Sequence, residues 1–123
     1  MNDIVRVSDI ISVLDEAFPL KSQDDWDNSG LIIGSPEMQV RGVLFSVDIT
    51  QQCVDEAIEN GLNMIVAHHP MLFRGAKRIT GSSSEQRIIM SAIKNDIAIC
   101  AFHTPADKAS CGLSSMLAKQ IGI

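Results

Sequence analysis

The sequence predicts a single α/β domain with a mostly parallel sheet and flanking helices. Three short apolar segments, each of strand length, alternate with two segments of helical periodicity from residue 40 onward. Such a β-α-β-α-β succession is typical of a parallel sheet covered by helices. The chain of 123 residues is long enough for one domain, which we place over 1–123. Its 46% apolar and 20% charged residues are typical of a globular protein rather than a disordered one.

The first third of the chain predicts a helix, a loop and a short strand. Residues 8–18 begin with a serine that can cap a helix, carry apolar residues at helical spacing and end before Pro19. Residues 21–30 are rich in turn-forming residues and predict a loop. A strand over Leu31–Ile33 follows, and Gly34 ends it. The regular alternation of strand and helix begins only after this region.

Three further strands are predicted, over 40–47, 63–67 and 97–102. The last two are continuous apolar runs, as expected when helices cover both faces of a sheet. Thr50 is the predicted cap of a helix over 51–60, and Gly61 follows the end of that helix. The remaining predictions are a loop over 68–83, a helix over 85–95 capped by Ser84 or a neighbour, and a closing amphipathic helix over 109–120.

All three histidines of the chain lie at the predicted carboxyl ends of strands. His68 and His69 follow one strand, and His103 follows the next, with Asp107 about one helical turn later. Ligands of open α/β sheets bind beyond these strand ends. Imidazole and carboxylate groups are ligands of zinc, iron and manganese ions. The sequence therefore predicts a metal site formed by His68, His69, Asp107 and His103.

The adjacent pair His68-His69 favours two ions over one. Neighbouring side chains of an extended segment point to opposite sides, so the two rings would not readily chelate the same ion. They could serve two ions bridged by Asp107, and such sites activate water for attack on a phosphoryl or carbonyl centre. Asp48, after an earlier strand, could orient the water or a metal-bound imidazole. It could equally belong to the capping region of the next helix.

Other conspicuous residues have ordinary structural explanations. Trp26 fits a half-buried aromatic ring that holds its loop in place. Three basic residues of the long loop could hold an anionic substrate, but they also fit a solvated loop face: Arg74, Lys77 and Arg78. The three cysteines form no CxxC pair, and we interpret them as small, buried or half-buried hydrophobic residues: Cys53, Cys100 and Cys111.

Charge and hydropathy argue against several classes of partner. The net charge is −5 and the sequence pI is about 5.0. Nucleic-acid binding rests on the neutralisation of phosphates, so this balance argues against it. No apolar run reaches the roughly 18–20 residues of a membrane span, and the first residues do not form a signal peptide. We expect a cytoplasmic protein without a membrane partner.

Two motifs, His68-His69-Pro70 after an apolar strand and His103-Thr104-x-x-Asp107, resemble the Nif-three-like (Ngg-one-interacting-factor-three-like) family. Its members are also labelled GTP cyclohydrolase I type 2 homologs. The resemblance extends to the Trp-Asp-Asn-Ser-Gly-Leu segment at 26–31 and to Val-Asp-Ile-Thr at 47–50. It implies that His68, His69 and Asp107 bind a pair of divalent ions, with His103 at or beside them. It also implies assembly of the chains into a hexameric ring.

The sequence departs from the family pattern in two respects. Pro105 and Ala106 stand where the family usually has Asn-Leu, and proline fixes the backbone angle φ there. Family chains are also much longer, and their C-terminal half supplies a further histidine and glutamate spaced H-x-x-x-E. We therefore expect 1–123 to be the N-terminal half of a longer chain. Such a half should fold and self-associate, but bind divalent metal weakly, at most about one ion per site, and turn over little or no substrate.

Two functions are compatible with these features. The first is a metal-dependent hydrolase of a nucleotide or a phosphorylated small molecule, with two ions of zinc, iron or manganese per complete site. The second is a non-catalytic metal-binding protein that acts in ring assembly or regulation. The second hypothesis is motivated by the absence from the sequence of a nucleophile motif, a P-loop or a GxGxxG segment.

Overall fold

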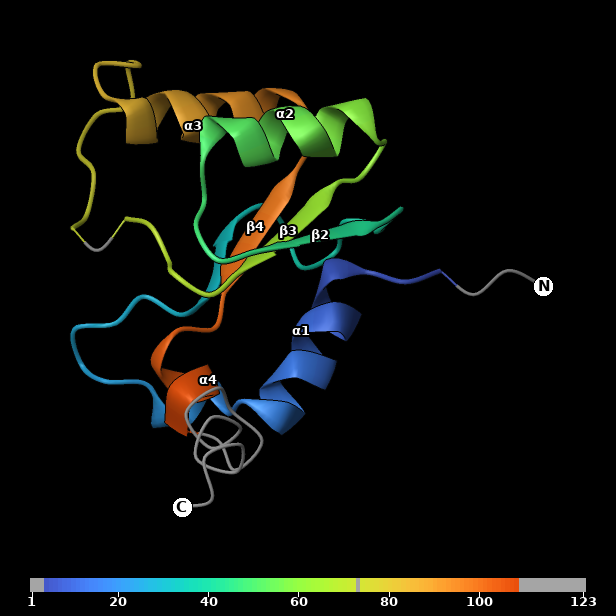
Figure 1. Cartoon of the computed structure of the whole chain (residues 1–123), viewed down its shortest axis with the longest axis vertical. Helices are drawn as coiled ribbons and strands as arrows, with labels where there is room; N and C mark the ends of the chain where they lie inside the picture. Colours follow the sequence, from blue (N-terminus) through green and yellow to red (C-terminus); the bar gives the residue numbers. More distant parts are fainter. Residues whose placement is uncertain (1–3, 73, 109–123) are drawn as a thin grey trace, which may run out of the picture.

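The computed structural model describes residues 4–72 and 74–108 and shows a four-stranded sheet between helices (Figure 1). The strands lie in the order β1-β4-β3-β2. β2 pairs with β3, and β3 with β4, in parallel, whereas β1 pairs with β4 antiparallel. Their bounds are Gly30–Ile33 for β1, Val43–Ser46 for β2, Met64–Ala67 for β3 and Ala98–Ala101 for β4. The predicted α/β class with a mostly parallel sheet is confirmed.

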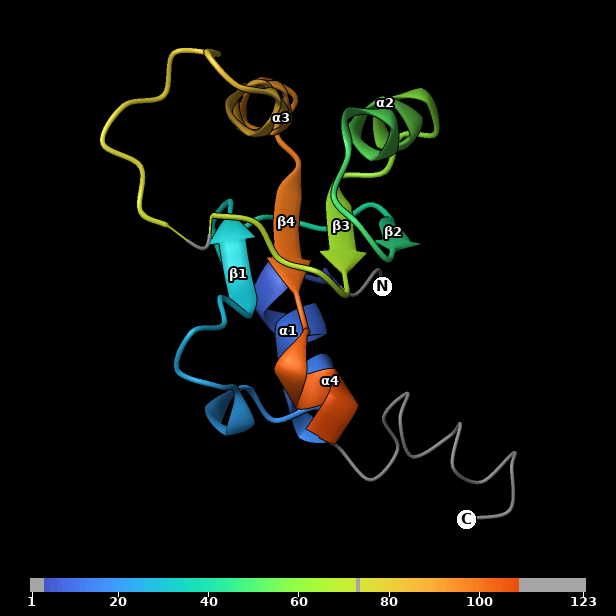
Figure 2. The same cartoon turned by 60° about the vertical axis from the view of Figure 1, so that its left-hand side comes forward.

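Helices cover both faces of the sheet. Helix α2, Gln51–Glu59, and helix α3, Ser84–Lys94, lie side by side on one face, and helix α1, Val7–Ala17, lies on the other (Figures 1 and 2). Ile65 and Ile99 belong to the core cluster under α2 and α3, while Met64 and Cys100 belong to the cluster under α1. This alternation explains why β3 and β4 are continuous apolar runs. Every residue of both strands is buried.

The two helix–strand units α2-β3 and α3-β4 begin and end in the same way. The side chain of Thr50 accepts a hydrogen bond from the backbone N–H of Cys53, and Ser83 caps α3 in the same manner. Gly61 after α2 and Asp96 after α3 both have positive φ, +67° and +54°. In both turns the next residue's N–H returns to the last helical turn. The predicted cap at Thr50 and the predicted stop at Gly61 are confirmed.

The N-terminal elements differ in detail from the prediction. Helix α1 begins at Val7, so Ser8 lies inside it, and the carboxylate of Asp9 accepts a hydrogen bond from the N–H of Arg6. The predicted strand over 40–47 is shortened to β2, because the N–H of Arg41 turns to the side chain of Asn63. A short 3-10 helix, Leu20–Ser22, precedes the loop before β1.

The last described residues form a helix that the sequence did not predict. Helix α4, Thr104–Lys108, is separated from the end of β4 by two residues and begins directly after His103. The predicted helix over 109–120 lies outside the described residues. Within 4–72 and 74–108, none of the helices has the length and apolarity that crossing a bilayer requires.

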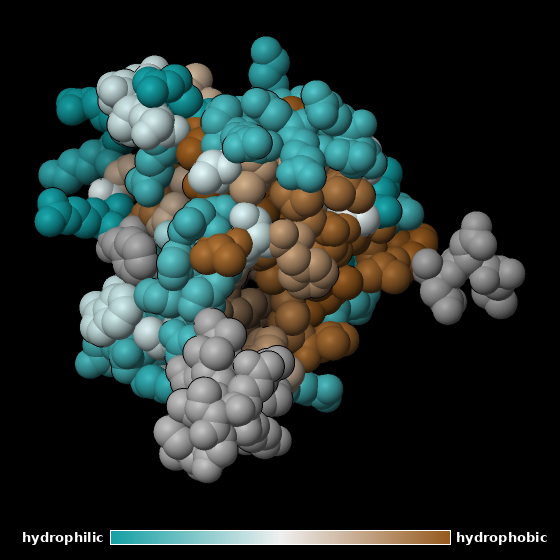
Figure 3. Space-filling view, in the orientation of Figure 1, coloured by the Kyte–Doolittle hydropathy of each residue, from teal (hydrophilic) through white to brown (hydrophobic). Residues whose placement is uncertain are grey.

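One part of the surface is conspicuously apolar. Phe45 is 70% and Val47 60% exposed, and both belong to or follow the edge strand β2. Phe45 lines a groove of about 210 Å³ with α1 and with residues near the ends of β3 and β4. In Figure 3, brown apolar surface is visible below the polar surface of the α2 region. We call Phe45 and Val47 the β2 patch.

Candidate metal centre

The parallel pairing of β3 and β4 brings the three histidines together. Ala67 and Ala101 are paired in register at the ends of these strands, and the histidines follow one to two residues later. His68, His69 and His103 each offer one ring nitrogen, and these three atoms lie within 4.8 Å of one another. The ring centroids are 5.0 to 5.3 Å apart. We call these residues the histidine triad, and this spacing would allow all three rings to coordinate one ion.

The expectation that His68 and His69 point to opposite sides is wrong. Their ring centroids are only 5.0 Å apart, with 40° between the ring planes. The alternation of side chains belongs to regular strand, and β3 ends at Ala67. The backbone bends at both histidines, so the two rings face the same space. That the pair serves two ions stays a prediction.

One nitrogen of each imidazole faces an oxygen of the protein. Nδ1 of His68 lies 3.2 Å from the carbonyl oxygen of Phe102, and Nδ1 of His69 lies 2.6 Å from Oδ1 of Asp48. Nδ1 of His103 lies 3.4 Å from Oδ1 of Asp27. Metal-binding histidines characteristically direct their second nitrogen to a carboxylate or a carbonyl, which fixes tautomer and ring orientation. His68 and His69 have this arrangement, whereas the 3.4 Å contact of His103 with Asp27 is not a hydrogen bond.

Asp27 is the residue at this site that the sequence analysis missed. Its side chain is fully buried and accepts hydrogen bonds from Ser29 Oγ, from the N–H of Asn28, and from both the N–H and the hydroxyl of Thr104. Burial alone would raise the pKa of Asp27, but these hydrogen bonds outweigh it and leave the pKa below its ordinary value. The Asp27-Asn28-Ser29 segment signals a local turn, but nothing local signals the contact with Thr104.

Asp48 contacts His69, the most exposed histidine of the triad. Its carboxylate contacts His69 at 2.6 Å, and the two side chains are 65% and 48% exposed. A cavity of about 210 Å³ opens there, lined by Asp48, His69 and the first residues of α3, Ser84 and Glu85, among others. This position beside His69 fits the predicted role of Asp48 in orienting an imidazole. The role itself stays a prediction. The capping bond of α2 is made by Thr50, not by Asp48.

Asp107 adjoins the triad through His68. It lies on α4, and its Oδ1 is 3.7 Å from Nε2 of His68. Its side chain is 39% exposed, so it borders the open space rather than the core. Pro105 is buried, and α4 starts directly after His103. The departure from the family motif at residues 105 and 106 therefore coincides with a helix that carries Asp107 to the site.

Trp26 is more exposed than the sequence analysis expected. It is 59% exposed, and its ring meets that of His103 nearly edge to face, with centroids 5.5 Å apart and 76° between planes. The neighbours of Trp26 hold the loop. Besides the bonds of Asp27, the side-chain amide of Asn28 donates to the carbonyl oxygens of Met71 and Leu72. The explanation of Trp26 as a half-buried clamp is therefore wrong in its burial.

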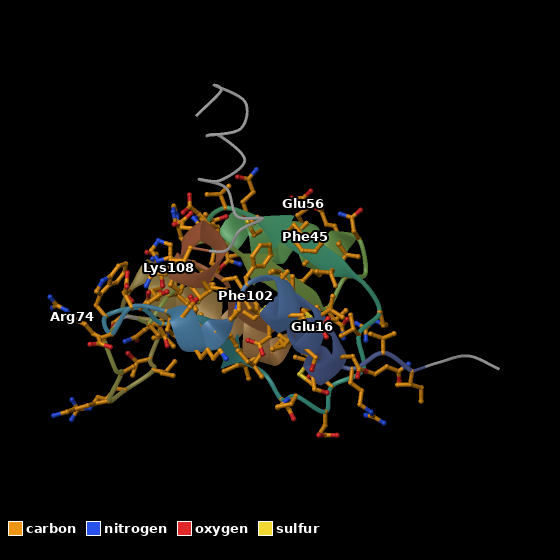
Figure 4. The ribbon with its side chains drawn as sticks, turned by 90° about the horizontal axis from the view of Figure 1, so that it is seen from below. Glu16, Phe45, Glu56, Arg74, Phe102 and Lys108 are labelled. Carbon is orange, nitrogen blue, oxygen red and sulfur yellow. The ribbon has the colours of Figure 1, made fainter. Side chains whose placement is uncertain are left out.

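The basic loop lies apart from the triad. Arg74, Lys77 and Arg78 are exposed, and they line a groove of about 370 Å³ with the start of α3. The side chain of Arg74 extends outward from the body of the molecule (Figure 4). An anion-holding role and a solvated loop face both remain predictions for these residues.

The comparisons with known proteins agree on one family. A curated relative from Streptomyces coelicolor, named GTP cyclohydrolase 1 type 2 homolog, is 41% identical over 113 residues, which are 92% of this chain and 40% of the relative. The crystal structure of a Staphylococcus aureus hypothetical protein superposes with a TM-score of 0.91 at 38% identity, over 99% of this chain and 35% of that one.

A third comparison gives the same result. The structure of a Bacillus cereus protein related to NIF3 has a TM-score of 0.90 at 40% identity, and the match covers 99% of this chain and 34% of that protein. The chain thus spans between about a third and two fifths of the length of these relatives. Residues 5–123 match the family described as Duf34/NIF3 (NGG1p interacting factor 3). The match covers nearly the whole chain, and the resemblance seen in the sequence is confirmed: the chain belongs to the DUF34/NIF3 family.

Proposed function

We propose that the histidine triad binds a divalent metal ion and that the protein is a metal-dependent hydrolase of a nucleotide or another phosphorylated small molecule. The observation that carries this proposal is the position of three imidazoles whose Nδ1 atoms all face protein oxygens. At His68 and His69, where Nδ1 is engaged by a hydrogen bond, Nε2 is the nitrogen available to an ion. Three protein ligands with an open fourth position are the common donor set of catalytic zinc.

The chemistry of the donors fits zinc, iron or manganese. Imidazole is a borderline ligand for all three, and Asp107 adds a hard carboxylate oxygen beside His68. We propose two ions per complete site, with Asp107 reaching the second. His68, His69, His103 and Asp107 alone are too few donors for two ions. A second ion therefore requires ligands in addition to these four.

The residues around the triad have distinct tasks in this proposal. A bound divalent ion supplies a Lewis acid and a water of lowered pKa. Asp48 holds the ring of His69 in the tautomer that leaves Nε2 without a proton, and the carboxylate of Asp27 faces Nδ1 of His103 at 3.4 Å. The cavity beside Asp48 and Glu85 is the space in which a phosphorylated substrate would approach His69. The carbonyl of Phe102 holds His68 in the same way.

Metal binding and turnover together test the proposal. We expect calorimetry with zinc to show one site in the wild-type chain and none in the double variant His68→Ala with His69→Ala. The exposed Glu59→Gln at the far end of α2 is the matched control and should bind zinc like wild type. Turnover of nucleotides and phosphodiesters should require the metal and both histidines. Hydrolysis that survives the double variant would contradict the proposal, and so would the absence of metal binding.

A non-catalytic role in metal-dependent assembly is the second candidate, and the β2 patch favours it. Exposed apolar residues on an edge strand are a hallmark of an interaction surface. We propose that this face is covered in a homo-oligomer, as in a ring of chains. Sedimentation velocity should show an assembly in the wild type that Phe45→Ser disrupts and that the exposed Ile93→Ser on α3 does not. Tight metal binding with an intact assembly, but without turnover of any phosphoester, would favour this candidate over hydrolysis.

A further inference from the structure

Three of the ten basic residues of the chain lie within five positions of one loop, and no acidic residue lies between Glu59 and Glu85. The three side chains are exposed: Arg74, Lys77 and Arg78. Among the residues that the structure describes, no carboxylate forms an ion pair with any of them. In a chain with a net charge of −5, this loop is therefore a local concentration of uncompensated positive charge.

The loop is anchored at both ends, although it arches away from the sheet before α3 begins (Figure 2, yellow). At its start, the N–H of Leu72 donates a hydrogen bond to Oε2 of Glu85, at 3.3 Å. At its end, Oε1 of Gln86 accepts a hydrogen bond from the N–H of Thr80, and its Nε2 donates to the carbonyl of Arg78. Gln86 lies in the first turn of α3, so the helix holds the backbone that carries Arg78. This anchoring lowers the entropic cost of placing the basic side chains around a ligand.

The groove beside this loop adjoins the cavity at the histidine triad. The three basic residues line the groove of about 370 Å³, whereas Asp48 and His69 line the cavity of about 210 Å³. Glu85 lines both of them. A ligand that is bound at His69 could therefore extend past Glu85 into the groove. Two regions suited to anionic groups thus lie next to each other, one at the triad and one among uncompensated cations.

The charges of the groove favour a phosphate group that is separate from the one at the triad. A guanidinium group binds phosphate through paired N–H donors, and a lysine adds a point charge. The carboxylate of Glu85 has the opposite effect, because it repels an anion placed between the two regions. A ligand with contiguous phosphates would bring negative charge close to Glu85. A ligand whose two phosphates are separated by a neutral sugar would avoid this repulsion.

We propose that the groove of Arg74, Lys77 and Arg78 binds the second phosphate of a substrate whose other phosphate is held at the histidine triad. This inference rests on the proposed function, since it assigns the substrate class of that site. The class is a small bisphosphate with its phosphates on different carbons of a sugar or a nucleoside. A monophosphate held at the triad would gain nothing from the groove.

A comparison of three adenosine compounds tests the substrate class. At a fixed concentration of free zinc, we expect calorimetry to show that adenosine 3′,5′-bisphosphate binds about tenfold more tightly than adenosine 5′-monophosphate. Adenosine 5′-diphosphate, whose two phosphates are contiguous, should also bind more weakly than the bisphosphate. The preference for the bisphosphate should decrease with added sodium chloride, because the basic side chains are exposed. Equal or tighter binding of either of the other two compounds would overturn the proposal.

Substitutions then assign the preference to the groove. Arg74→Gln with Arg78→Gln should lower the affinity for the bisphosphate about tenfold, to near that of the monophosphate, whose own affinity should not change. The matched control is Arg41→Gln with Lys94→Gln, which removes the same charge from exposed positions outside the groove and should behave like wild type. If the first double variant keeps the preference, or if the control loses it as well, the proposal is wrong.

Two further measurements distinguish a failure of this proposal from a failure of the proposed function. Zinc affinity, measured without nucleotide, should be the same in Arg74→Gln with Arg78→Gln and in wild type, since neither arginine is a ligand. If zinc does not bind but a preference for the bisphosphate remains and requires both arginines, the metal function fails and the groove stands. Zinc binding without that preference would mean the reverse. If single-stranded RNA binds through the same arginines more tightly than the bisphosphate, the groove is a nucleic-acid surface, and the proposal is wrong.

Discussion

The histidine triad has a closed corner, formed by His103 and Asp27, and an open corner, formed by His69 and Asp48. Both corners pair an imidazole Nδ1 with an aspartate oxygen. At the closed corner the carboxylate is fully buried and accepts four hydrogen bonds, whereas at the open corner it is 65% exposed. The same pair of groups, an imidazole and a carboxylate, therefore lies in two different environments. Asp27 also ties its loop to Thr104, whereas the carboxylate of Asp48 contacts His69.

Two cysteines of the described residues, Cys53 and Cys100, repeat this contrast. Cys100 lies on β4, three residues before His103, and is completely buried. Burial raises the pKa of its thiol to about 12. Cys53 lies at the start of α2, where its Sγ is 3.4 Å from the carbonyl oxygen of Asp48. Partial burial would raise the pKa of Cys53, but hydrogen bonds with Ser46 and Thr50 outweigh that effect and lower it.

Thiol alkylation should show the largest difference between the corners. In a Cys111→Ser background, we expect iodoacetamide to modify Cys53 at least about 1000-fold faster than Cys100 at neutral pH. The pKa of Cys100 is some three units above that of an ordinary thiol, each unit reduces the reactive thiolate tenfold, and Cys100 is also inaccessible. Peptide mass spectrometry measures both rates. The two sites should be labelled equally in urea, and equal labelling of the native protein would contradict the assigned burial.

Truncating Asp27 and Asp48 should lower the free energy of unfolding by different amounts. Asp27→Ala leaves several buried donors without their acceptor, and we expect it to lower the free energy of unfolding by about 3 kcal/mol. Asp48→Ala removes an exposed partner and should cost no more than about 0.5 kcal/mol. Urea denaturation followed by circular dichroism measures both. Similar losses of stability in the two variants would remove the distinction between a closed and an open corner.

At the open corner, we expect a substitution of Asp48 to change metal affinity rather than stability. We expect Asp48→Asn to weaken zinc binding about tenfold, the lower end of the range for losing an oriented partner of a histidine ligand, with the urea midpoint unchanged. Calorimetry at constant pH measures the affinity, and Asp55→Asn on α2 is a control of the same chemistry. Wild-type zinc affinity in Asp48→Asn would mean that this carboxylate does not orient His69.

Sequence reasoning located the open corner better than the closed one, for a physical reason. β3 and β4 could be recognised because strands buried on both faces lose their alternation, and His68, His69 and His103 follow their ends. Asp48 was identified as a candidate in the same way. Asp27 could not be, because its role depends on a hydrogen-bond partner 77 residues away. The antiparallel placement of β1 beside β4 joins these regions, and no local pattern specifies that pairing.

The side-by-side position of His68 and His69 was unpredictable for a different reason. The alternation rule is sound within β3, but the strand ends one residue before the pair. Strand ends are the least certain feature of a sequence-based prediction, and a shift of one residue reverses the expected direction of a side chain. The predicted set of candidate ligands was insensitive to this error, since it depended only on which residues follow the strands.

The antiparallel pairing of β1 with β4 also has a consequence for how the chain reaches its native state. β1 pairs with β4, and the contact between Asp27 and Thr104 beside this pair closes a loop of 77 residues. Contacts at such large sequence separation carry a high entropic cost and tend to slow folding. During synthesis, a nascent chain has no complete triad until His103 has emerged. Competence to bind an ion should therefore appear in the same kinetic phase in which β1 joins the edge of the sheet.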